Sequence, residues 1–135
     1  MLQVITIAAL CIDAEHIMRM WLGDPHYFMY NYGMAFSTFQ NRPVMSTVIT
    51  SIATVMIGIA AFHPNNDTCD RVSYSLMLGG ALSNLTEKLI LGYVIDWIKV
   101  PFIPLVINIA DIEITLGVII SSVSFFFEPI IKLPR

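Results

Sequence analysis

The chain has 135 residues, of which 56% are hydrophobic and only 13% charged, and its formal net charge is −3. This length fits one domain, and the composition excludes a disordered tail, a disulfide scaffold and a nucleic-acid-binding protein, which needs a basic surface. A soluble domain carries about a quarter charged residues. Most of this surface must therefore meet something other than water, and we expect an integral membrane protein with a single domain over residues 1–135.

Four apolar stretches have about the 20-residue length that crosses a hydrocarbon core about 30 Å thick. The second contains no charged residue, whereas the other three hold ionisable groups that must face the protein interior or an interface. The sequence thus predicts an all-α membrane protein with four transmembrane helices, the three polar ones enclosing the functional site. The predicted spans are residues 2–22, 44–62, 72–95 and 103–127.

Glycine and proline separate these stretches. Pro43 opens the second, while Pro101 and Pro104 disfavour helix before them, so the fourth helix should begin near Leu105. An even number of spans places both termini on one side of the membrane. The basic residues near the membrane number three on that side against two on the other, which favours cytoplasmic termini.

Residues 26–37, between the first two spans, alternate in polarity with the period of a β-strand. Bulky side chains such as Tyr30 and Tyr32 fall on one face, and small or polar ones such as Asn31 and Gly33 fall on the other. The aromatic face suits lipid headgroups, and the small face could receive a ligand. An aromatic belt that only anchors a loop explains the pattern equally well.

Two aspartates lie where the third and fourth spans meet. Asp96 ends the third span and Asp111 lies near the beginning of the fourth. Because consecutive spans run antiparallel, these two positions lie at the same membrane face and the carboxylates can meet. From Asp111 to Phe127 is about 25 Å of helix, which leaves Asp111 just inside the outer boundary of the bilayer.

Paired carboxylates in a partly desolvated site cannot both ionise cheaply, so one keeps a proton while the other acts as a base. Aspartic proteases use this arrangement to activate water and to bind the scissile carbonyl. The sequence does not say which aspartate takes which part. Two isolated aspartates are explained at least as well by a helix cap or a loop charge at the interface.

Further polar groups recur at helical spacing beside the aspartates. Asn108, Asp111 and Thr115 form one polar stripe, and Asn84 and Lys88 are four residues apart on the third span. Gly79 and Gly80 permit close approach of a neighbouring helix, for which simple helix packing is the better explanation.

These residues resemble the lipoprotein signal peptidases, or signal peptidase II, a family of bacterial intramembrane aspartyl peptidases. Four motifs stand in the family's order on the predicted elements, and the resemblance covers about residues 31–117. They are N-Y-G-M-A-F-S at 31–37 against N-x-G-A-A-F-S, G-G-A-L-S-N at 79–84 against G-G-A-x-x-N, G-Y-V-I-D at 92–96 against G-x-V-x-D, and N-I-A-D at 108–111 against N-x-A-D.

The resemblance implies that Asp96 and Asp111 form the catalytic dyad and that the aromatic strand belongs to a small extracytoplasmic β-strand cradle after the first helix. The implied reaction hydrolyses the bond before the diacylglyceryl-modified cysteine of a prolipoprotein, in the bacterial cytoplasmic (inner) membrane, with the active site near the outer face. It implies membrane lipids as neighbours and no metal or organic cofactor. The sequence leaves the oligomeric state open, and a monomer is compatible with it. The predicted substrate-binding residues are Asn31, Gly33, Asn84, Lys88 and Asn108.

The chain departs from the family at several positions. Glu87-Lys88 replaces the usual Asp-Arg and so exchanges a forked guanidinium for a point charge. In the first helix Asp13 aligns with the family's D-Q-x-[ST]-K but no lysine follows it, while Glu15 and Arg19 form a separate i, i+4 pair for which we expect a structural role. Glu113, about 200° around the helix from Asp111, should face a different neighbour or the headgroups.

The sequence leaves two other functions open. A diverged, non-catalytic relative that binds signal helices or lipids would account for the departures, although both aspartates are present. A small proton-coupled carrier would also place carboxylates in the membrane. Carriers, however, keep such sites near the bilayer midplane and at repeats or broken helices, and no internal repeat is evident in this sequence.

Overall fold

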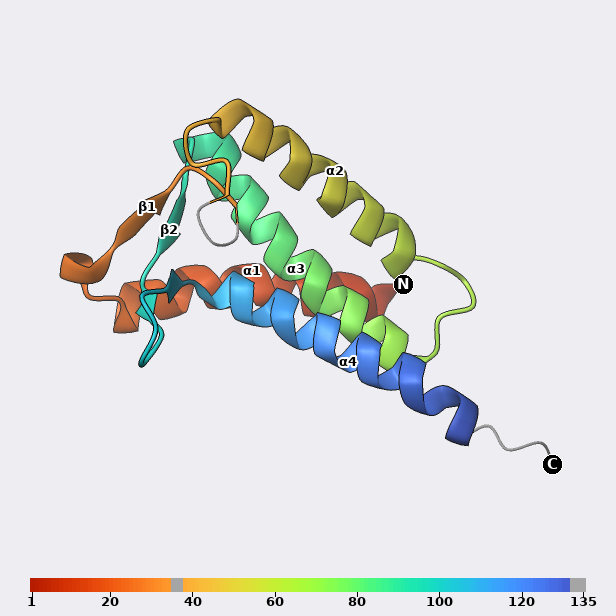
Figure 1. Ribbon diagram of the computed structural model, residues 1–135. Coiled ribbons are helices and arrows are strands. Elements are labelled where there is room, and N and C mark those ends of the chain that lie inside the picture. Colours follow the sequence, from red (N-terminus) through yellow and green to blue (C-terminus); the bar gives the residue numbers. More distant parts are fainter. Residues whose placement is uncertain (35–37, 132–135) are drawn as a thin grey trace.

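Figure 1 shows the computed structural model, which describes residues 1–34 and 38–131. Four long helices form a bundle, and short strands gather beyond one end of it. The elements in chain order are α1 (Leu2–Leu22), the 3-10 turn η1 (Pro25–Tyr27), β1 (Met29–Asn31), α2 (Pro43–Ala61), α3 (Thr68–Leu91), β2 (Val94–Asp96), β3 (Ile98–Lys99), β4 (Val106–Ile107) and α4 (Ile109–Ile131).

Helix α3 is the centre of the bundle, because it packs against each of the other three helices. Small residues make this close approach possible. A side-chain carbon added at Gly80 would lie 2.4 Å from the carbonyl oxygen of Ala110 on α4, and one added at Gly79 would lie 2.5 Å from Cys11 Cβ on α1. The two neighbouring glycines therefore let α3 contact α1 and α4 through its backbone.

The ends of α3 are fixed by local signals in the sequence. Asp67 and Asp70 form a capping box at its start, each side chain accepting from the other's backbone N–H. Gly92 ends it in the left-handed conformation, with φ of 83°. The chain therefore leaves the helix sharply and enters β2 two residues later.

Two small antiparallel sheets lie at this end of the bundle. Strand β1 pairs with β2 so that Met29 lies opposite Asp96 and Asn31 opposite Val94. The other sheet pairs β3 with β4. Because α4 begins two residues after β4, the strands hold the end of α3 and the start of α4 at the same face of the molecule.

Apolar and polar side chains are distributed as in a membrane protein. Ile59 and Met56 of α2 are 70% and 65% exposed, whereas Glu15 and Asn108 are 2% and 1% exposed. Helix α2 and residues Ile109–Phe127 of α4 are long and apolar enough to cross a membrane. The mostly helical architecture expected from the apolar stretches is confirmed by the four long helices.

The predicted boundaries of the first two helices are correct to within one residue, but others differ. Helix α3 begins at Thr68 and not at residue 72, because Asp67 caps it, and α4 ends at Ile131 and not at residue 127. Asp96 lies on β2 and not at the end of a helix, because Gly92 has already ended α3. The fourth helix begins at Ile109 and not near Leu105, because Val106 and Ile107 form β4. The predicted strand at 26–37 is limited to Met29–Asn31, since η1 precedes it, and residues 35–37 of that prediction lie outside the described part.

Candidate active site

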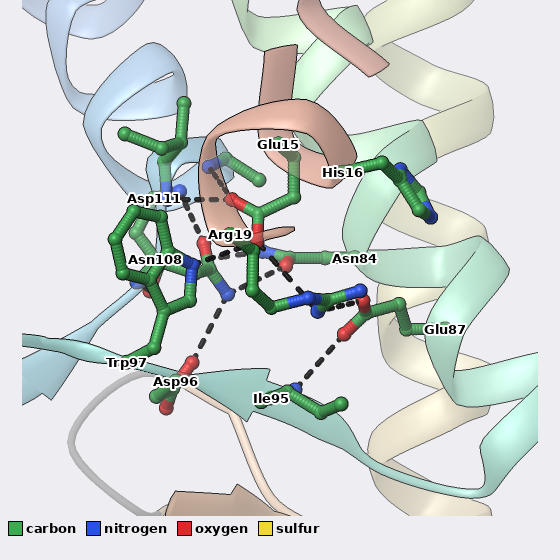
Figure 2. Close-up of polar contacts among 12 residues, drawn as sticks. Glu15, His16, Arg19, Asn84, Glu87, Ile95, Asp96, Trp97, Asn108 and Asp111 are labelled. Carbon is green, nitrogen blue, oxygen red and sulfur yellow. Dashed lines mark hydrogen bonds and ion pairs between the residues drawn. The ribbon is translucent and has the colours of Figure 1, made fainter. Parts of the chain in front are cut away.

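Asp96 and Asp111 are joined by one hydrogen-bonded network (Figure 2). Asn108 lies between them, and its Nδ2 donates to Asp96 Oδ1 at 3.0 Å and to Asn84 Oδ1 at 3.0 Å. Asn84 in turn donates through Nδ2 to Asp111 Oδ1 at 3.0 Å. Asn31 donates to the other oxygen of Asp96, also at 3.0 Å. Two carboxylates and three amides from four separate segments thus converge at one place.

The start of α4 explains why Asn108 and Asp111 face the same site. Asn108 Oδ1 accepts from the backbone N–H of Asp111 at 2.8 Å, and Asp111 Oδ2 lies 3.4 Å from the backbone nitrogen of Asn108. This reciprocal pattern is a capping box, which satisfies backbone groups that the helix leaves unpaired. The cap therefore orients the Asn108 amide so that its two hydrogens face Asp96 and Asn84.

Burial governs the charge state of Asp96. This residue is 5% exposed, and its burial, followed by the nearby charge of Asp111, raises the pKa of its carboxyl to about 7. The hydrogen bonds from Asn31 and Asn108 act in the opposite direction, because they favour the ionised form. A pKa near neutrality suits a group that must hold or transfer a proton at physiological pH.

Gly33 and Lys88 lie beside this network and hold the loop that follows β1. The Lys88 Nζ donates to the Gly33 carbonyl, to Ser46 Oγ at 2.6 Å and to Thr50 Oγ1 at 3.4 Å. The Gly33 N–H donates to Asn31 Oδ1 at 2.9 Å. Lys88 is 6% exposed, so the structure places its ammonium behind the loop, where it supports Gly33 and through it Asn31.

A second set of polar side chains lies against the site and was not predicted to belong to it. Trp97 Nε1 donates to Glu15 Oε1 at 3.0 Å, and Glu15 Oε2 accepts from the Ile109 N–H at 2.7 Å. Glu15 and Arg19 do form the expected i, i+4 pair, at 3.7 Å. The sequence signal was the presence of charged residues in an apolar helix, but it did not indicate their partners.

The remaining members of this set reach the strand that carries Asp96. Arg19 pairs with Glu87 of α3, and Glu87 Oε2 accepts from the backbone N–H of Ile95 at 2.9 Å (Figure 2). Asp13, the residue aligned with the family's acidic position, is exposed instead.

Two other polar residues of α4 do not join the network. Thr115 bonds to the Asp111 carbonyl of its own helix, so the predicted polar stripe ends at Asp111. Glu113 is 7% exposed and lies against Cys11 of α1, consistent with the expectation that it faces a different neighbour. Within residues 1–34 and 38–127, no group of three or more His, Cys, Asp or Glu side chains is placed to hold a metal ion.

The fold and the site together define a helical membrane protein with one buried and one partly buried aspartate at one end of its bundle, joined by hydrogen bonds through asparagine side chains. Residues 7–127 match the family described as signal peptidase (SPase) II, and the chain belongs to this family of membrane proteases.

Named relatives agree with this assignment. The lipoprotein signal peptidase of Caldanaerobacter subterraneus subsp. tengcongensis is 32% identical over 107 residues, which cover 76% of this chain and 74% of the relative. That of Streptococcus agalactiae serotype V is 34% identical over 106 residues, 75% of this chain and 67% of the relative. A solved structure described as a bacterial membrane enzyme at 2.3 Å shares the fold, with a TM-score of 0.78 at 23% identity, and the match covers 98% of this chain and 92% of that one.

Proposed function

We propose that this chain removes signal peptides from prolipoproteins as an aspartyl endopeptidase, hydrolysing the bond before the diacylglyceryl-modified cysteine. Membership in the signal peptidase II family supports the reaction. The observation that carries the catalytic assignment is the hydrogen-bonded network in which Asn108 links Asp96 to Asn84 and Asp111. Asp96 and Asp111 are the catalytic dyad in this proposal.

The chemistry follows from two carboxyl groups that share one proton. The ionised partner accepts a proton from a water molecule while the water oxygen forms a bond to the scissile carbonyl carbon. The protonated partner donates a hydrogen bond to the carbonyl oxygen and stabilises the charge that develops there. The tetrahedral intermediate collapses when the carbon–nitrogen bond breaks and the departing amine takes a proton from the dyad. No step requires a metal or organic cofactor.

The substrate site lies around this dyad. Asn31, Asn84 and Asn108 line it, and each already donates to a carboxylate or to a neighbouring amide, so they hold the acidic groups while substrate binds. Gly33 brings its backbone close to the site. Lys88 acts on substrate through Gly33, because its ammonium donates to the Gly33 carbonyl.

We infer that all four long helices span the bacterial cytoplasmic membrane, with the strands and the active site near its outer face. The strands and both aspartates lie at one end of the bundle, and most of the large exposed side chains of the helices are apolar. The signal helix and the lipid of the substrate can then reach the dyad from within the bilayer. Membrane lipids cover the helices, and one chain supplies every residue of the site.

A diverged, non-catalytic relative is the alternative function. It would need neither carboxylate to be held in a defined geometry, whereas this structure uses four hydrogen bonds to hold them, two to Asp96 and two to Asp111. The network therefore favours the enzyme.

Cleavage of a diacylglyceryl-modified prolipoprotein by the purified, detergent-solubilised chain tests the proposal. Asp96→Asn and Asp111→Asn are each expected to lower kcat by at least about 1,000-fold, since neither amide can take a proton from water. The KM should stay within about threefold, because the amide keeps the size of the carboxyl group. An unlipidated substrate and Asp70→Asn, at the opposite end of α3, serve as controls. Turnover at the parent rate by either dyad variant would rule out the catalytic assignment.

A further inference from the structure

Glu15 of α1 connects the two segments that carry the aspartates. Its carboxylate is buried, at 2% exposure, and its two oxygens accept from different parts of the chain. Oε1 accepts from Nε1 of Trp97, the residue after Asp96, at 3.0 Å. Oε2 accepts at 2.7 Å from the N–H of Ile109, the first residue of α4 and two positions before Asp111. One side chain therefore bridges both sides of the site.

We infer that Glu15 is a positioning residue of this peptidase, which sets the separation of Asp96 and Asp111 by bonding to Trp97 and to the start of α4 at once. The inference rests on the proposed function. A further contact is needed to hold Asp96, because β2 is three residues long and pairs with a single three-residue strand. Such a two-stranded ladder is only marginally stable in isolation, so other contacts must hold Asp96 in place.

Arg19 and Glu87 complete the support of β2. Arg19 pairs with both Glu15 and Glu87, which offsets the cost of burying two anions. Glu87 accepts from the N–H of Ile95 at 2.9 Å. The residues on either side of Asp96 are thus both anchored to carboxylates of the same cluster, one through its backbone and the other through its indole.

The placement of Glu15 predicts an effect on turnover and not on substrate binding. Glu15 forms hydrogen bonds with Trp97 and the first backbone N–H groups of α4, and an ion pair with Arg19. None of these groups belongs to the proposed substrate site. A shift of the carboxylates by a fraction of an ångström lowers the rate of the chemical step without removing a substrate contact. A residue needed only for folding would lower the amount of active enzyme instead.

The pH dependence supplies a second readout. The charged groups that act on Asp96 are Asp111 from α4, Glu15 from α1 and Lys88 from α3. Removal of the Glu15 charge lowers the pKa of Asp96, because the nearby anion opposes its ionisation. The alkaline limb of the pH–rate profile should then move to lower pH.

The experiment compares Glu15→Gln, Trp97→Phe and Asp13→Asn in the full chain with lipidated substrate. Glu15→Gln keeps the shape of the side chain but replaces one carboxylate oxygen with an NH2 group. This group would face an N–H donor, either the indole of Trp97 or the backbone of Ile109. We expect kcat to fall about 10- to 100-fold with KM changed less than about threefold, and the alkaline limb to shift to lower pH. Trp97→Phe removes one hydrogen-bond donor, so kcat should fall about tenfold. Because it removes no charge, the alkaline limb of the pH–rate profile should stay where it is. Exposed Asp13→Asn removes the same charge from the same helix and should match the parent.

The outcomes separate this inference from the proposed function. If the parent cleaves lipidated substrate and both Glu15→Gln and Trp97→Phe retain its kcat, the positioning role is wrong while the peptidase stands. If Glu15→Gln does not fold, Trp97→Phe alone decides the question by its kcat. A fall in active-site concentration with unchanged kcat per active site would also overturn the inference, because it indicates a folding role only.

Discussion

Asp96 and Asp111 meet at one asparagine, but the two segments that carry them are built differently. Asp111 lies in the first turn of the 23-residue α4, which is packed backbone to backbone against α3 at Gly80. Asp96 lies on the three-residue β2, whose position depends on the side chains of Asn31, Glu87 and Glu15. Helix packing thus fixes one carboxylate, and polar contacts from distant parts of the chain fix the other.

The difference shows how a membrane protein can hold a polar site at its edge. Within the bundle, small residues let the helix backbones approach closely, and the resulting dispersion contacts stabilise the packing of the helices. Beyond the ends of α3 and α4 the backbone is irregular, and each strand is too short to be stable alone. Buried ionic side chains supply the missing constraint there.

Apart from changes to the two aspartates themselves, the largest effect should come from Asn108→Ala, which separates the two segments that carry them. This change removes the donors to Asp96 and Asn84 and the cap acceptor for Asp111. We expect a loss of about 100-fold in kcat/KM, equivalent to about 2.7 kcal/mol, measured on lipidated substrate. Asn65→Ala in the exposed turn between α2 and α3 is the matched control. A loss below about threefold would show that Asn108 does not join the two segments.

A smaller effect is expected from Gly80→Ala, which acts on the Asp111 side alone. The added carbon would lie 2.4 Å from the Ala110 carbonyl oxygen, so α4 must move away from α3. We expect kcat to fall about tenfold and the free energy of unfolding to fall by about 1–3 kcal/mol, followed by thermal unfolding in detergent.

Gly58→Ala provides the control for this change. The same added carbon at Gly58 meets only Leu78 Cδ1 at 3.7 Å, an ordinary contact. Its activity and its unfolding temperature should equal or slightly exceed those of the parent. If the two alanine variants had the same kcat and the same unfolding temperature, close packing at Gly80 would not be what positions Asp111.

A fall in kcat of about twofold near neutral pH, the smallest of these effects, concerns the Asp96 side and needs no mutation. The reaction requires the proton shared by the dyad, and the raised pKa of Asp96, about 7, means that this proton is lost as the pH rises through neutrality. Between pH 6 and pH 7 we expect kcat to fall about twofold, between pH 7 and pH 8 about fivefold, and above pH 8 about tenfold per pH unit. A rate that stays constant from pH 6 to pH 9 would contradict this protonation state.

Much of the helical frame could be predicted from the sequence, because it depends on local signals. Hydrophobic length and proline placed α1 and α2 to within a residue. The third and fourth helices are shorter at the site because Gly92 ends one and Asn108 caps the other. An apolar run does not distinguish helix from the short strands on either side of Asp96.

The meeting of Asp96 and Asp111 could also be predicted, since it follows from antiparallel connection of two helices. The partners of Asn31 and Glu15 could not, because their contacts join segments 65 and more residues apart and leave no periodic pattern. The contacts of Lys88 could not be predicted from the sequence either. The family resemblance implied a substrate contact for Lys88 but did not indicate the partners that its ammonium has in the structure, which are Gly33, Ser46 and Thr50.

The pairing of Glu15 with Arg19 has a consequence for how the chain is made. Both residues leave the ribosome long before their distant partners, since Glu87 lies 68 positions after Arg19 and Trp97 lies 82 positions after Glu15. At about 5–20 residues per second, synthesis of 68 residues takes roughly 3 to 14 s. If α1 spans the membrane as proposed, the two charges can neutralise each other during this interval, because they lie one helical turn apart. The same pair that later supports the candidate site would then lower the free-energy cost of inserting its own helix.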